Sequence, residues 1–136
     1  MFLECDKCSL HKKGKAVAGE GPKPADIMIV GINPGPKEIE QGRILVGPTG
    51  RKIEQALILA ALAREDIYMT NIVKCYTPAS STKKISKTHV GICVREHLLQ
   101  EIKEVQPKVI IVMGRAATGF IQVKFIPDST FKYPTY

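Results

Sequence analysis

The sequence contains no tryptophan, and aromatic residues make up only 6% of its 136 positions. It also lacks a long apolar run. The longest, at 27–30 and 109–113, are far short of the ~20 residues that a helix needs to cross a bilayer. The first residues show no basic stretch followed by an apolar one, so they do not resemble a secretory signal. These absences argue against a membrane span and favour a cytoplasmic protein.

Acidic residues are also scarce. There are 13 Asp and Glu against 20 Lys and Arg, which gives a formal charge of +7 and a pI near 9.3. A pI above 9 is typical of nucleic-acid-binding proteins, although anionic metabolites attract the same charge. The basic residues are spread along the chain, which suits a face that follows a phosphate backbone. The length fits a single domain over 1–136.

Four cysteines are present: Cys5 and Cys8 in a C-x-x-C pair, then Cys75 and Cys93. Disulfides are disfavoured in a cytosolic chain. The C-x-x-C spacing lets two thiolates reach one metal ion or cluster. From spacing alone, a structural zinc site, an iron–sulfur cluster and four unrelated thiols all remain open.

Short apolar segments alternate with helical patterns along the chain. Residues 25–31 predict a buried strand, and residues 66–73 and 108–113 predict a second and a third strand. Apolar spacing predicts one helix from Thr49, as its cap, to about Ala63, a second over 86–105, and a short one that opens after Gly114. This alternation predicts an α/β fold of three layers, α/β/α, around a small and mainly parallel central sheet. Ligands bind beyond the carboxyl ends of such strands.

The loop after the first strand reads Gly31-Ile32-Asn33-Pro34-Gly35. Other motifs lie before and after this loop. In chain order they are Cys5-x-x-Cys8, Val17-x-Gly19-Glu20-Gly21, Gly35-x-x-Glu38, Gln41-Gly42-Arg43, Thr70-Asn71-x-Val73-Lys74-Cys75, Cys93 and Gly114-Arg115. Together they resemble the uracil-DNA glycosylase superfamily over almost the whole chain. The layout is most similar to the iron–sulfur family four enzymes, while the G-I-N-P-G loop is closer to the mismatch-specific uracil/thymine branch.

The resemblance implies a DNA repair enzyme that flips uracil out of DNA and hydrolyses its N-glycosidic bond. It places Asn33 where the superfamily positions the attacking water, and Asn71 where it reads the uracil edge. The other implied substrate-binding residues are Gly31, Ile32, Gly35 and Leu45, the last standing where the family stacks an aromatic ring. Two plainer interpretations remain: Asn33 stabilises a Pro-Gly turn, and Asn71 simply ends a strand.

The resemblance also implies that Cys5, Cys8, Cys75 and Cys93 ligate a four-iron–four-sulfur (4Fe-4S) cluster of structural role. It implies contacts to DNA phosphates from Lys74, Ser80, Ser81 and Lys83. The expected partner is uracil-containing DNA, single- or double-stranded. No membrane partner is expected, and the protein is expected to act as a monomer.

The family's second motif, His-Pro-Ser, is not recognisable in this sequence. The sequence stops at Tyr133-Pro134-Thr135-Tyr136, and His11, His89 and His97 do not match the missing histidine. Two interpretations are open: the protein is a naturally reduced member of the family, or its sequence has been cut at the C-terminal end. His97 is expected to be a structural or surface residue. The alternative function is a catalytically weak or inactive iron–sulfur module that binds DNA or protein as a replication or viral accessory.

Overall fold

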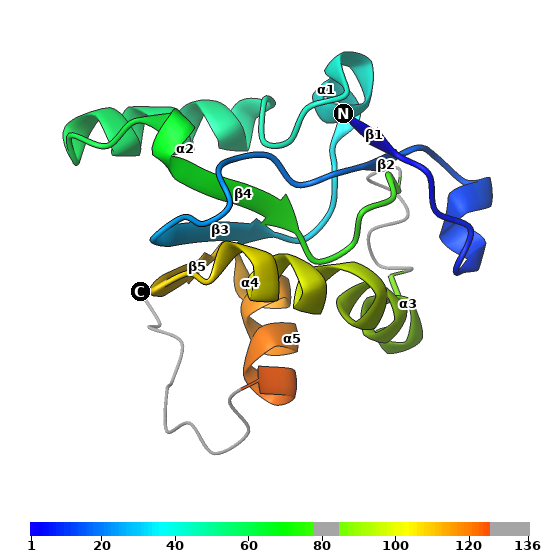
Figure 1. Ribbon diagram of the computed structural model, residues 1–136. Coiled ribbons are helices and arrows are strands. Elements are labelled where there is room, and N and C mark those ends of the chain that lie inside the picture. The colour runs from blue at the N-terminus through cyan, green and yellow to red at the C-terminus, as the bar shows by residue number, and fades with distance from the viewer. Residues whose placement is uncertain (78–84, 126–136) are drawn as a thin grey trace.

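The computed structural model describes residues 1–77 and 85–125 of the protein, and its centre is a parallel sheet (Figure 1). The sheet holds β3 (Ile27–Gly31), β4 (Ile67–Asn71) and β5 (Val109–Val112) in the order β4-β3-β5. Gly31 is in register with Asn71, and Val30 with Val112. The carboxyl ends of the three strands therefore meet at one edge of the sheet.

Helices cover both faces of this sheet (Figure 1). On one face lies α2 (Pro48–Leu59), and on the other lie α3 (Lys87–Cys93), α4 (Leu99–Val105) and α5 (Arg115–Phe125). Strand β3 serves both layers, because Ile29 packs with the α2 cluster and its neighbours Met28 and Val30 with the other. The predicted three-layer α/β/α fold is confirmed.

The helix boundaries differ from the prediction at α2. Its cap is Gly47 and its first residue is Pro48, so the prediction of Thr49 as the cap is wrong. Proline is favoured at the first helical position because its fixed φ suits the helix and its missing N–H is not needed there. The helix also ends at Leu59, short of Ala63.

The predicted helix over 86–105 is present as one continuous helical run. Ser86 caps α3 by accepting a hydrogen bond from the His89 N–H at 3.2 Å. A π-helical turn, η4 (Val94–Leu98), joins α3 directly to α4. The run ends where Gln106 adopts a left-handed backbone conformation, with φ 49°, just before Pro107.

The N-terminal segment lies against the end of β4. Strands β1 (Phe2–Leu3) and β2 (Ala16–Val17) form an antiparallel pair around the 3-10 helix η1 (Ser9–Lys12). Ala16 then bridges to Cys75. Two further short helices, α1 (Pro36–Gln41) and η2 (Arg64–Asp66), lie in the connections from β3 to β4. In the ranges 1–77 and 85–125, no helix is long and apolar enough to span a membrane.

Candidate active site

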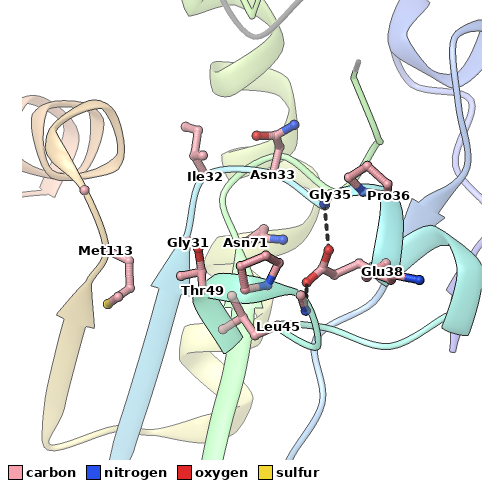
Figure 2. Close-up of a pocket in the computed structure, with 14 residues that line it drawn as sticks. Gly31, Ile32, Asn33, Gly35, Pro36, Glu38, Leu45, Thr49, Asn71 and Met113 are labelled. Atoms are coloured by element: carbon pink, nitrogen blue, oxygen red, sulfur yellow. Dashed lines mark hydrogen bonds between the residues drawn. The ribbon is translucent and has the colours of Figure 1, made fainter. Parts of the chain in front are cut away.

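A pocket of about 650 Å³ opens where the strands of the sheet end (Figure 2). Every residue expected to be catalytic or substrate-binding lines it: Gly31, Ile32, Asn33, Gly35, Leu45 and Asn71. Met113 and Gly114, which follow β5, line it as well. The structure thus brings together side chains from three loops, as expected for ligand sites at the carboxyl ends of parallel strands. Their individual roles remain predictions.

Asn71 is the most informative side chain in the pocket. It ends β4 opposite Gly31 and is only 1% exposed. Its Nδ2 is a buried amide donor with no hydrogen-bond partner among the described residues. Buried polar groups are nearly always paired, so an unpaired donor that lines a pocket points to a ligand acceptor. A Cβ at position 31 would lie 2.4 Å from Asn71 Oδ1, so only glycine allows this approach.

The amide of Asn33 is partly engaged by the protein itself. Its Nδ2 donates to Thr77 Oγ1 at 2.8 Å and, at 3.4 Å, to the carbonyl of Pro34. Figure 2 shows the side chain rising from the rim of the pocket, on the side away from Leu45. The contact with Thr77 fixes the amide, which leaves Oδ1 as the atom that could orient a water.

Glu38 ties two pocket loops together, and the sequence did not mark it as a site residue. Its carboxylate accepts hydrogen bonds from the backbone N–H groups of Gly35 at 3.0 Å, Val46 at 2.9 Å and Gly47 at 2.8 Å. Two of these contacts are drawn in Figure 2. The side chain lines the pocket but is only 7% exposed. The signal that could have revealed it is its position in the first turn of α1, three residues after the Gly35 cap.

Leu45 forms an apolar wall in a constrained backbone conformation. Its φ is +50°, in the left-handed region that non-glycine residues seldom occupy. Arg64 holds the segment by donating to the carbonyls of Ile44 and Leu45, the latter at 3.0 Å. Gly50 packs beneath it, where a Cβ would lie 1.8 Å from the Leu45 carbonyl oxygen. The wall is therefore held both by Arg64, 19 positions away, and by Gly50, five positions away.

The four cysteines lie near one another in the fold. All are free thiols; Cys75 and Cys93 are buried, and Cys5 and Cys8 are partly buried. Burial raises the pKa of Cys75 to about 12, with a further contribution from the other three thiols. The pKa of Cys93 is also raised by burial, against the hydrogen bond from the Lys74 backbone N–H. Among the residues that the structure describes, no three His, Cys, Asp or Glu side chains are already arranged as a metal site.

His97 lies beside this cysteine group. Its Nε2 is 3.2 Å from Cys5 Sγ, and burial lowers the pKa of the imidazole. Its turn of helix, η4, begins directly after Cys93. The sequence predicted only a structural or surface role for His97, on a helix, and gave no sign of this contact because Cys5 is 92 positions away in the chain.

The expected DNA contacts are not supported at Lys74. Its side chain is 1% exposed and its Nζ lies 2.6 Å from the Glu101 carboxylate, so it cannot reach a phosphate. The prediction of Lys74 as a DNA-binding residue is therefore wrong. The other three residues expected there, Ser80, Ser81 and Lys83, lie outside the described residues.

A model of the uracil DNA glycosylase superfamily matches residues 18–132. The chain belongs to the uracil-DNA glycosylase superfamily. The family expected from the sequence motifs is confirmed, and it agrees with a pocket at the strand ends and with the glycine loop around Asn33.

Relatives within this superfamily carry the name type-4 uracil-DNA glycosylase. One from Pyrobaculum aerophilum is 41% identical over 115 residues, which cover 84% of this chain and 57% of the relative. One from Archaeoglobus fulgidus is 36% identical over 121 residues, 88% and 59% of the two chains. A third, from Saccharolobus solfataricus, is 34% identical over 120 residues, 87% and 54%. The chain thus spans a little more than half the length of these relatives.

Proposed function

We propose that this chain carries the base pocket of a uracil-DNA glycosylase, which takes uracil flipped out of DNA and hydrolyses its N-glycosidic bond. The observation that carries the proposal is the buried, unpartnered Nδ2 of Asn71 inside the pocket. A side-chain amide offers one donor and one acceptor group. Nδ2 would donate to uracil O4 and Oδ1 would accept from N3–H, so Asn71 can satisfy the edge that distinguishes uracil from cytosine.

The remaining pocket residues suit a flat, flipped base. Gly31 and Gly35 place no side chain in the pocket, whereas Ile32 and Leu45 supply apolar contact. Asn33 would orient the attacking water through Oδ1, since its Nδ2 is held by Thr77. An amide is a weak base, but the sugar becomes cation-like as the bond breaks and accepts a weak nucleophile. The basic charge of the chain favours DNA as the partner, and we propose that it acts as a monomer.

The proximity of the four free thiols supports the proposal of a thiolate-bound metal centre. The pKa of Cys75 is raised partly because the other three thiols lie close enough to repel its charged form. A bound metal removes that repulsion by taking the thiolates as ligands. We propose that Cys5, Cys8, Cys75 and Cys93 hold a 4Fe-4S cluster, which would join the N-terminal segment to α3 as a structural staple.

Uracil excision tests the main proposal. The protein is incubated with a single-stranded uracil oligonucleotide, and alkali then cleaves any abasic site. We expect Asn71→Ala to excise uracil roughly 10- to 100-fold more slowly than wild type, since a bidentate contact to a base is worth about 1–3 kcal/mol. Gln55→Ala removes an exposed amide from α2 and should excise at the wild-type rate. Wild-type cleavage no greater than that of Asn71→Ala would refute the proposal.

The cluster is tested separately, on protein purified without oxygen. We expect a brown protein with about four iron atoms and four sulfides per chain. Cys93→Ser should lower both contents together with the visible absorbance. A colourless wild-type protein that holds zinc would refute the cluster without touching the base pocket.

A further inference from the structure

A buried cation lies directly behind the base pocket. Lys74 is 1% exposed, and its Nζ donates to Thr70 Oγ1 at 2.5 Å, to Glu101 Oε2 at 2.6 Å and to the Asn71 carbonyl at 2.8 Å. These three contacts use all three N–H groups of the ammonium. Lysine is almost never fully buried unless it is paired in this way.

Glu101, on helix α4, is the acidic partner of Lys74. It projects from α4 and also accepts hydrogen bonds from Tyr68 Oη at 3.2 Å and from Thr70 Oγ1 at 3.0 Å. Gly19 lies tightly against the same group, where a Cβ would be 2.4 Å from Tyr68 Oη and 2.8 Å from Glu101 Oε1. The chain therefore packs closely around the ion pair, in which the Lys74 side chain is 1% and the Glu101 side chain 13% exposed.

Asn71 depends on this support more than its own contacts suggest. Its Nδ2 has no hydrogen-bond partner among the described residues, so that end of the amide is not anchored by a bond of its own. The direction of the side chain is set by the backbone at the end of β4. Lys74 holds that backbone at the carbonyl of Asn71, three residues before it in the chain.

We propose that Lys74 is a positioning residue of the base pocket, which fixes the backbone of Asn71 and so aims its amide at the base. The inference rests on the proposed function, because its test measures base binding. The contacts of Lys74 with Asn71 do not depend on that function. Lys74 is also joined to the cysteine group, because its N–H donates to Cys93 and Cys75 follows it. The pocket and the cysteines thus share one buried support.

The test replaces both members of the ion pair, because removal of Lys74 alone would leave the Glu101 charge buried without its partner. In Lys74→Met/Glu101→Gln the glutamine oxygen still accepts from Tyr68 and Thr70, while the donor to the Asn71 carbonyl is lost. In Lys74→Gln/Glu101→Gln an amide donor to that carbonyl is retained. Lys103→Met, at an exposed site on α4, controls for the loss of one lysine.

The assay compares the affinity for single-stranded DNA that contains 2′-fluoro-deoxyuridine, which resists cleavage, with the affinity for the same strand containing 2′-fluoro-deoxycytidine, whose base edge reverses the donor and the acceptor that Asn71 would meet. We expect the Met variant to lose the preference for uracil by about 10-fold. The Gln variant and Lys103→Met should stay within about twofold of wild type. In an Asn71→Ala background, the Met variant should cause no further loss, because Lys74 acts through Asn71.

A Met variant that keeps the wild-type preference, or losses that multiply in the Asn71→Ala background, would overturn the proposal. So would equal losses in the Met and Gln variants.

A crystal structure of the Met variant gives a readout that does not depend on uracil: we expect Asn71 to be displaced, and an unmoved Asn71 would refute its positioning by Lys74. If wild type shows no preference for uracil, the proposed function fails, and this structure alone decides the role of Lys74. Should the Met variant not fold, Lys74→Leu/Glu101→Gln, which also lacks the donor to the Asn71 carbonyl, takes its place with the same expected loss.

Discussion

The carboxylate of Glu38 offers a sharp test of how the pocket is held together. It accepts three backbone hydrogen bonds, two at Oε1 from Val46 and Gly47 and one at Oε2 from Gly35. Glu38→Gln can keep the two bonds at Oε1, but it places an NH₂ group against the Gly35 N–H. Glu38→Ala removes all three bonds and leaves the loops on either side of α1 without their link.

The expected loss of stability follows from these contacts. A hydrogen bond to a charged group contributes about 1.5–3 kcal/mol, and a buried donor left unpaired costs a further desolvation penalty. Glu38→Gln loses one such bond, so we expect the free energy of unfolding to fall by about 2 kcal/mol. Glu38→Ala loses three, and we expect about 4 kcal/mol, which is near the upper end for single substitutions.

Urea unfolding measures both losses, with Glu40→Gln as the matched control. Glu40 is on the same helix, but it is exposed and, among the described residues, paired only with Lys37, so its replacement should cost less than about 0.5 kcal/mol. The slope of the unfolding free energy against urea should be unchanged in all variants, which shows that the native state alone is affected. If Glu38→Gln is no less stable than Glu40→Gln, the three hydrogen bonds do not stabilise the pocket loops and the reasoning fails.

Two further substitutions test the wall and the surface. Gly50→Ala would place a Cβ 1.8 Å from the Leu45 carbonyl oxygen, so we expect the free energy of unfolding, measured by thermal unfolding, to fall by more than ~2 kcal/mol. Gly91→Ala is the control, because its Cβ would meet nothing within 4 Å. It should be neutral or stabilising by up to ~1 kcal/mol. Arg43 lowers the pKa of Glu20 from its ordinary 4.5 through a side-chain hydrogen bond, so the pair stabilises the protein above that pH. Arg43→Gln should therefore be less stable than wild type at pH 7, and the difference should shrink as the pH falls below 4.5; a difference that stays constant would show another cause.

The sheet and the place of the pocket were predictable because they follow from local patterns. Apolar runs before Gly31 and Asn71 mark strands that must be buried, and parallel strands bring their carboxyl ends to one edge. The loop around Asn33 then had to face the residue that ends the next strand. The order of the motifs predicted membership of the uracil-DNA glycosylase superfamily, and the match over residues 18–132 confirms it.

Several contacts around the site could not be predicted from the sequence, because they depend on partners that are distant in the chain. A lysine beside a cysteine gives no sign that Glu101, 27 residues later, will bury it. The proximity of His97 to Cys5 depends on the fold bringing the N-terminal segment to α3. The positive φ of Leu45 is not favoured by any property of leucine, and Arg64, which donates to its carbonyl, is 19 residues later.

The π-helical turn between α3 and α4 fixes the rotational phase of two helices. Cys93 stands just before this turn and Glu101 lies beyond it, so one helical run presents a cysteine to its group and a carboxylate to Lys74. Each residue of a helix advances the face by about 100°. Removal of one residue from Val94–Leu98 would leave Cys93 in place but turn Glu101 away from Lys74. The number of residues in this short turn is therefore as constrained as their identity.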